Sequence, residues 1–155
     1  KSKKRRVTSS SSSRRKKKKK TSQTHTVNLK LELERENPIE VISKDLFKTQ
    51  IIAFKISENG YEINDFSKSI LEMYARQYTK APSVILDISG HFEDVDNAKA
   101  ESKKLADLVV DFLKLNGVPD SGIKVHYLGS DKSIASNQTS IGRAANRRVE
   151  IRIIL

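Results

Sequence analysis

The chain has 155 residues, which is enough for one domain and a tail. It contains no cysteine, which excludes disulfides, thiolate metal sites and cysteine nucleophiles. The formal net charge of +11 comes from one end, because residues 1–20 hold 12 of the 30 basic residues and no acid. The remaining residues carry 18 basic against 19 acidic side chains, so a basic nucleic-acid-binding domain is not expected.

Residues 1–24 predict a disordered basic tail, because they cannot bury enough apolar surface to offset the entropy lost on ordering. Such a polycation is expected to be a solvated tether for the domain. If it binds anything, anionic polymers or lipids are the expected targets, with nucleic acid as the weakest hypothesis. The chain begins with Lys, which suggests a processed protein or a fragment whose signal or anchor lies upstream.

Residues 25–48 predict an extra hairpin and linker. Apolar and polar residues alternate over residues 27–34, a period that indicates a strand with one buried face. A turn signal at residues 36–38 precedes a return strand at residues 39–42. The hairpin is expected either to extend the main sheet or to pair with a second copy of the chain.

From residue 49, apolar runs that predict strands alternate with periodic stretches that predict helices. We expect strands at residues 49–55, 84–89, 123–128 and 147–155, long helices at residues 64–79 and 97–116, and a short helix at residues 139–146. This order predicts a domain with helices packed on a sheet.

Both long helices carry an apolar stripe. In residues 64–79, Asp65 is the expected cap, and the expected buried stripe consists of Phe66, Ile70, Met73 and Tyr74. In residues 97–116 the stripe includes Leu105 and Leu113, and Gly117 occupies the position of a left-handed C-terminal cap.

Three stretches of residues 49–155 resemble the OmpA-like (OmpA/MotB C-terminal) domain family. Residues 85–91 resemble its strand and G-H turn, and residues 105–118 resemble its long helix. Residues 142–151 read GRAANRRVEI and resemble its closing signature. The resemblance implies an α/β (α+β sandwich) fold of order β-α-β-α-β-(α)-β, with a mixed four-stranded sheet and helices on one face.

The resemblance also implies a function. Such a domain is expected to be a non-catalytic periplasmic module that binds peptidoglycan and anchors an envelope protein to the wall. An acid in the turn after the second core strand and a cation at the start of the long helix are expected to grip diaminopimelate of the peptide stem. No cofactor is expected.

The candidate site departs from the family pattern. Glu93 stands at the position of the family's Asp, and Leu105 at that of its Arg, which would cost a charge-assisted contact. The candidate peptidoglycan-binding residues are His91, Glu93, Asn97, Lys104 and Arg147. Arg143, Asn146 and Arg148 belong to the signature, and they are expected to hold the final helix-to-strand corner.

A second hypothesis is a scaffold that has lost wall binding and assembles with a protein partner, or with itself, in an envelope machine. Leu105 and the hairpin before residue 49 motivate it. Other chemistry has little support. His25, His91 and His126 lie in separate predicted elements, so no zinc site is expected, and the acidic turn that follows His91 is expected to be solvated.

Overall fold

The computed structural model describes residues 44–155. The predicted basic tail and the two strands predicted between residues 27 and 42 lie outside the described residues. The first described element is a 3-10 helix, η2 (Lys44–Phe47), which buries Leu46.

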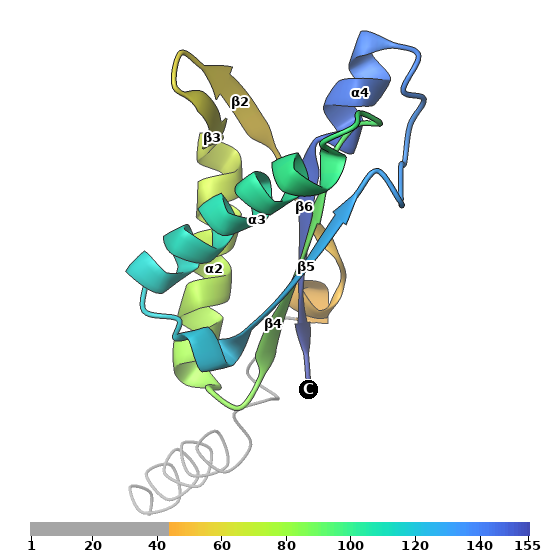
Figure 1. The fold of residues 1–155 in the computed structure, drawn as a ribbon. Helices are drawn as coiled ribbons and strands as arrows, with labels where there is room; N and C mark the ends of the chain where they lie inside the picture. Colours follow the sequence, from red (N-terminus) through yellow and green to blue (C-terminus); the bar gives the residue numbers. More distant parts are fainter. Residues whose placement is uncertain (1–43) are drawn as a thin grey trace, which may run out of the picture. The chain divides into compact units, whose positions relative to one another are not determined.

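A mixed four-stranded sheet forms the centre of the described domain (Figure 1). Its strands are β1 (Gln50–Ile52), β4 (Ile85–His91), β5 (Ile123–Gly129) and β6 (Arg148–Ile154), in the order β1-β6-β4-β5. The β4–β5 pair is parallel, and β6 is antiparallel to both β4 and β1. The predicted α/β fold with a mixed four-stranded sheet is therefore confirmed.

The strand expected at residues 49–55 is divided in two. The chain leaves the main sheet at Ala53, whose backbone N–H donates to the Ser67 hydroxyl at 2.9 Å. Strand β2 (Phe54–Ser57) then pairs with β3 (Gly60–Ile63) in a separate two-stranded sheet. An apolar run cannot reveal where the chain leaves the sheet, because the Ala53 N–H here donates to a hydroxyl of the following helix and not to a neighbouring strand.

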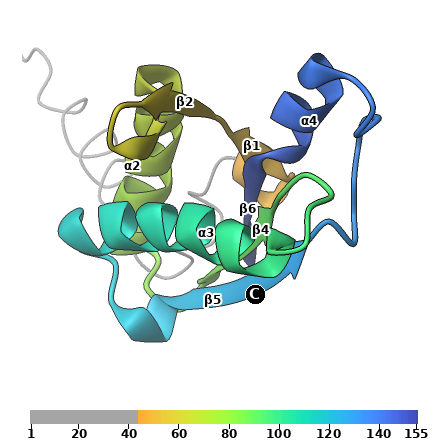
Figure 2. The ribbon, with the colours of Figure 1, turned by 45° about the horizontal axis from the view of Figure 1, so that its top comes forward.

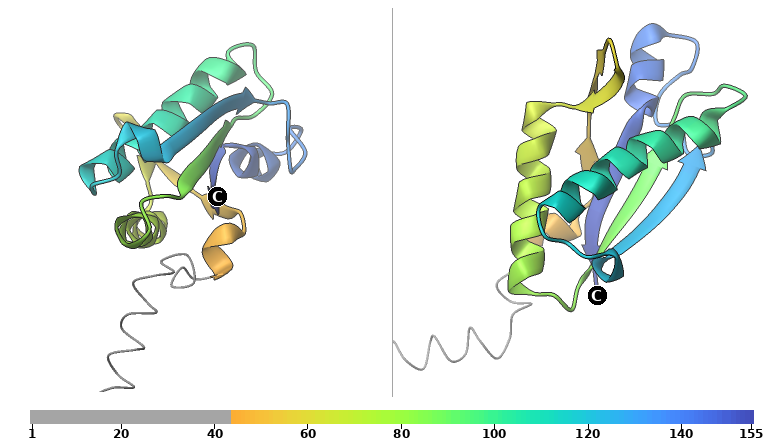
Figure 3. Two further views of the ribbon diagram at one scale, coloured as in Figure 1. Left: turned by 90° about the horizontal axis from the view of Figure 1, so that it is seen from below. Right: turned by 60° about the vertical axis from the view of Figure 1, so that its left-hand side comes forward.

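Two long helices, α2 (Asp65–Lys80) and α3 (Ala98–Leu115), lie on one face of the sheet (Figures 1 and 3). Asn64 caps α2, because its side chain accepts from the Ser67 N–H at 2.8 Å, so the expected cap at Asp65 is wrong by one residue. Gly117 has φ of 92° and ends α3 in the predicted left-handed conformation.

Helix α2 buries only part of the expected stripe, since Tyr74 is buried and Ile70 packs against the core. Phe66 is 76% exposed and Met73 is 44% exposed. The residues that face the core are Ser67, Leu71, Tyr74, Ala75 and Tyr78. Apolar residues surround most of this helix, so periodicity alone cannot decide which stripe faces the sheet.

Strand alternation gives the sheet two faces of opposite character. The face under α3 carries Leu86, Ile88, Val149, Ile151 and Ile153, all of them buried. Gly90 allows the closest approach, since a Cβ atom there would overlap the Ser102 carbonyl oxygen of α3. The opposite face is polar, and its cross-strand pairs include Asp87 with Arg152 and Ser89 with Glu150.

Helix α4 (Ser140–Asn146) stands at the end of the sheet where β6 begins, away from α2 and α3 (Figure 2). A short 3-10 turn, η3 (Asp120–Gly122), leads into β5. The short helix predicted at residues 139–146 is therefore present, and it places the closing signature beside the turn that follows β4.

Candidate functional site

The acid of the candidate site lies two residues beyond β4 and is held by two guanidinium groups. The Arg143 Nε atom is 3.2 Å from Glu93 Oε2, and the Arg147 Nη1 atom is 3.5 Å from Glu93 Oε1. The Glu93 side chain is 14% exposed, against 41% for Arg143 and 23% for Arg147. We call these three residues the Glu93 cluster. It carries one negative and two positive charges, so it retains an excess of one positive charge at a partly exposed site.

Helix α4 sets the position of both arginines. Thr139 caps this helix by accepting the Gly142 N–H at 3.0 Å. A Cβ atom at Gly142 would overlap the Ser136 carbonyl oxygen, so glycine lets the preceding loop lie against the helix. Arg143 also donates from Nη1 to the Asn137 carbonyl oxygen at 3.1 Å, which holds its guanidinium over the loop.

Asn146 holds the loop that faces Glu93 and is completely buried. Its Oδ1 atom accepts from the Ile134 N–H at 2.9 Å and from the Ala135 N–H at 3.1 Å. Its Nδ2 atom donates at 2.9 Å to the Ala135 carbonyl oxygen and to Asn137 Oδ1. These bonds hold the loop of residues 134–137 against the C-terminal end of α4.

The turn and the loop are also joined directly. Asn137 Oδ1 accepts from the Asp94 N–H at 3.2 Å, and the Ser130 hydroxyl donates to Asp94 Oδ1 at 3.3 Å. The turn that carries Glu93 is thereby fixed against the signature segment. Asp94 and Asn137 were not among the sequence-predicted site residues, although Asp94 follows Glu93 directly in the sequence.

The start of α3 does not supply the cation that the family pattern places there. Leu105 has no exposed surface and packs in the core. The Lys104 ammonium lies 2.6 Å from Glu101, and the Asn97 amide donates to the same carboxylate at 3.1 Å. Among the ion pairs of residues 44–155, Glu93 is bound only to Arg143 and Arg147. The geometry therefore groups Glu93 with Arg147, and it does not bring Asn97 or Lys104 to them.

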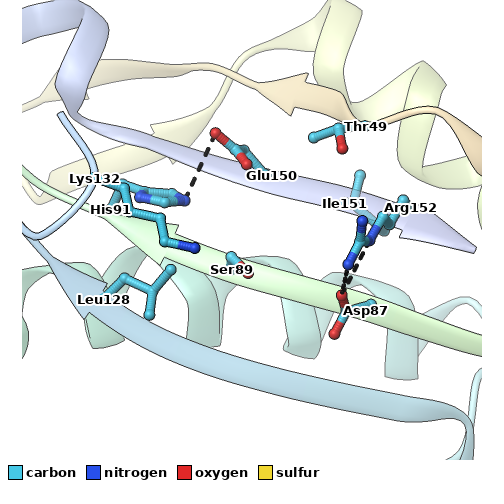
Figure 4. Close-up of a pocket in the computed structure, with 9 residues that line it drawn as sticks. All are labelled: Thr49, Asp87, Ser89, His91, Leu128, Lys132, Glu150, Ile151 and Arg152. Carbon is cyan, nitrogen blue, oxygen red and sulfur yellow. Dashed lines mark hydrogen bonds and ion pairs between the residues drawn. The ribbon is translucent and has the colours of Figure 1, made fainter. Parts of the chain in front are cut away.

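His91 points to the opposite, polar face of the sheet. Its residue exposure is 1%, and its Nε2 atom lies 3.7 Å from Glu150 Oε1 (Figure 4). Burial lowers the pKa of His91, the charge of Arg148 lowers it further, and Glu150 opposes them. Arg148 is 2% exposed and donates to Glu150 from Nε at 2.8 Å.

Comparison with known proteins assigns most of the described domain to one family. A model of the OmpA family matches residues 57–147. The chain belongs to the OmpA family. OmpA family domains are non-catalytic modules of the cell envelope, so membership confirms that this domain is not an enzyme.

Two curated relatives share the OmpA domain. ArfA of Mycobacterium tuberculosis, named as a peptidoglycan-binding protein, is 39% identical over 106 residues, which cover 64% of this chain and 31% of ArfA. The sodium-type flagellar protein MotY of Vibrio parahaemolyticus is 31% identical over 142 residues, which cover 76% of this chain and 48% of MotY. The chain spans about a third to a half of the length of these relatives.

Solved OmpA-type structures have the same fold. The peptidoglycan-associated lipoprotein of Burkholderia pseudomallei is 22% identical with a TM-score of 0.61, covering 76% of this chain and 99% of that one. The C-terminal domain of Helicobacter pylori MotB is 24% identical with a TM-score of 0.57, covering 68% of this chain and 84% of that one. At these identities the likeness establishes the fold.

The OmpA domain contains one polar cluster that sequence reasoning missed. Asp87 accepts from Arg152 Nη2 at 3.1 Å and from Nε at 3.2 Å, and its other oxygen is 3.1 Å from His126 Nε2. The signal was present as alternation, since Asp87, Ser89 and His91 are spaced by two in β4. The apolar run at residues 84–89 predicts a strand, but the polar positions of that strand entered no candidate site.

Residues 44–155 contain neither a membrane-spanning helix nor a metal-binding cluster. No helix in this range is long and apolar enough to cross a bilayer. No group of three or more His, Cys, Asp or Glu residues in the same range could hold a metal ion. The acidic turn after His91 thus gives no cation site among the described residues.

Proposed function

We propose that this OmpA domain binds peptidoglycan in the periplasm through the Glu93 cluster, and that it anchors an envelope protein to the wall. The observation that carries the proposal is the Glu93 carboxylate held between Arg143 and Arg147 at a partly exposed site. The 39% identity to ArfA, a protein named for peptidoglycan binding, supports the same ligand.

The ligand chemistry follows from these charges. The side chain of diaminopimelate ends in an ammonium and a carboxylate, so a site for it needs an acid beside a guanidinium. Glu93 supplies the acid, and the excess positive charge of the cluster is available to a carboxylate. Arg147 would then supply the cation that the family pattern places at the start of α3, where this chain has Leu105. The basic residues 1–20 are proposed to add contacts to anionic polymers or lipids of the envelope.

The test compares two stem peptides that differ in one carboxylate. One carries diaminopimelate, and the other carries lysine at the same position. We expect Arg147→Gln to weaken binding of the diaminopimelate peptide roughly ten- to hundredfold, because it removes a charge-assisted contact. Binding of the lysine peptide should change little, since that peptide lacks the second carboxylate. Isothermal titration calorimetry measures both.

A matched control removes a positive charge outside the Glu93 cluster, so that a general effect of charge can be distinguished from the loss of the binding site. Lys55 forms an exposed ion pair with Glu62 at 3.2 Å on the β2–β3 hairpin, so Lys55→Gln should bind both peptides as the wild type does. Retention of the full chain on purified sacculi should fall in Glu93→Gln and Arg147→Gln and remain in Lys55→Gln. Failure of the wild-type chain to bind either peptide and to pellet with sacculi would reject the proposal.

A second candidate function is a scaffold that assembles with proteins of an envelope machine instead of with the wall. Two observations favour it: Leu105 is buried at the position of the family cation, and the chain's own arginines already neutralise Glu93. It predicts no retention on sacculi and a self-associated or partner-bound chain in crosslinked envelopes. Replacing Leu29, Leu31 and Leu33 by serine should abolish that association, whereas it should leave stem-peptide binding intact under the first proposal.

A further inference from the structure

A polar pocket lies on the face of the sheet opposite α3, separate from the Glu93 cluster (Figure 4). Its volume is about 160 Å³, roughly ten times the space that one water needs. Side chains of β4 and β6 line it, and Thr49 and Lys132 border it from the segments outside these two strands. A pocket of this size accepts a small molecule or the end of a chain.

His91 is a buried polar group at one side of this pocket, and it lacks a hydrogen-bond partner among the described residues although its Nε2 atom lies 3.7 Å from Glu150 Oε1. Neither of its ring nitrogens makes a hydrogen bond within the described part of the chain, although the residue is 1% exposed. Leaving a buried donor unpaired costs about 1–3 kcal/mol. Native proteins rarely accept that cost away from a site that a ligand or water completes.

Two more donors face the same space. Figure 4 shows the Lys132 side chain extending over β4 toward Ser89, which lies on the floor of the pocket. Among the residues drawn there, Lys132, Ser89 and Thr49 make no hydrogen bond or ion pair with one another or with the rest. The acids are already occupied, because Asp87 is bound by Arg152 and Glu150 is bound by Arg148.

The charged residues around the pocket favour the binding of one monovalent anion. Lys132, Arg148 and Arg152 are positive, and Asp87 and Glu150 are negative, which leaves an excess of one positive charge. That charge is on Lys132, since each arginine is paired. A group with one negative charge would balance it, whereas a dianion such as phosphate would leave a negative charge beside Glu150.

We propose that this pocket binds a single carboxylate group, held by the Lys132 ammonium, the Ser89 hydroxyl and a ring N–H of His91. Two sources have this chemistry: a small free acid and the C-terminal end of a peptide. The site is distinct from the Glu93 cluster, so it can exist whether or not the cluster binds the wall.

The test is a titration of the isotope-labelled full chain, followed by nuclear magnetic resonance at the Ser89 amide and the His91 ring. The two probes are sodium acetate and N-acetyl-D-alanine. Both should shift these signals saturably. Tighter binding of N-acetyl-D-alanine identifies a chain terminus as the ligand, and equal binding identifies the carboxylate alone.

Two lysine variants decide whether the pocket is responsible. Lys132→Met should weaken carboxylate binding about tenfold or more, because it removes the unpaired charge. Lys124→Met is the matched control, since Lys124 is exposed on β5 and does not line the pocket. Absence of saturable shifts with both probes, or unchanged affinity in Lys132→Met, would overturn the proposal. Arg147→Gln should leave these shifts intact, so failure here is separable from failure of wall binding.

Discussion

Arg147 Nη1 lies 3.5 Å from Glu93 Oε1, which joins the turn after β4 to the residue just before β6. The family pattern places the cation opposite this acid at the start of the long helix, where this chain has Leu105. Glu93 still has a guanidinium partner, but that partner is Arg147 of the closing signature.

Leu105→Arg should destabilise the domain and should not restore a ligand contact. Leu105 is completely buried, so the variant would place an unpaired charge in the core. We expect the free energy of unfolding in urea to fall by roughly 3 kcal/mol or more. Lys104→Arg, one residue away and exposed, should change it by less than about 0.5 kcal/mol. A variant at Leu105 as stable as the wild type would show that this helix can turn its side chain out toward Glu93.

Asn146→Ala should loosen the loop that faces Glu93. The substitution leaves the N–H groups of Ile134 and Ala135 without their acceptor. We expect a loss of roughly 2–3 kcal/mol and faster hydrogen exchange at these two amides. Asn116→Ala removes one exposed bond to the Phe112 carbonyl and serves as the control, with little effect on either measurement. Unchanged exchange at Ile134 would contradict the role assigned to Asn146.

Tyr74→Phe should cost about 1 kcal/mol of stability. The Tyr74 hydroxyl lies 3.2 Å from the carbonyl oxygens of Leu46 and Ile151 and is buried with them. Burial raises the pKa of Tyr74 above its ordinary value of 10.0. The unfolded chain therefore loses this proton first, and stability should decline as the pH rises above about 10.

That decline is measured by urea unfolding across the alkaline range. The component due to Tyr74 should be absent in Tyr74→Phe and present in Tyr61→Phe. Tyr61 is the control because it is only partly buried and makes an edge contact with the Phe92 ring. An identical alkaline decline in both variants would mean that Tyr74 ionises alike in the folded and unfolded chains.

His91 should make the domain less stable in mild acid. Burial and the neighbouring Arg148 lower the pKa of His91 below its ordinary value of 6.5. As the pH falls, His91 is therefore protonated in the unfolded chain before it is protonated in the folded chain. The free energy of unfolding should decrease as the pH drops below about 6.5. The dependence should disappear in His91→Gln and persist in His126→Gln, as followed by thermal unfolding. If the pH dependence of stability disappeared only in His126→Gln, the effect would belong to His126 and the prediction for His91 would be wrong.

The sequence by itself determined the family, the order of the core elements and the acid of the candidate site. Period-two alternation, periodic stripes and the run from Gly142 to Ile151 are local signals, so they are readable without coordinates. The same locality explains the cap at Gly117, which depends on the backbone of one residue.

Only the tertiary structure decided which groups meet. Phe66 and Met73 are exposed because α2 turns a neighbouring stripe toward the sheet, and a helix surrounded by apolar residues does not specify that rotation. The partners of Glu93 come from residues 50 and 54 positions further along the chain. Spacing along the chain fixes which side chains share an element, and the pairing between distant elements depends on how β4, α4 and β6 pack against one another.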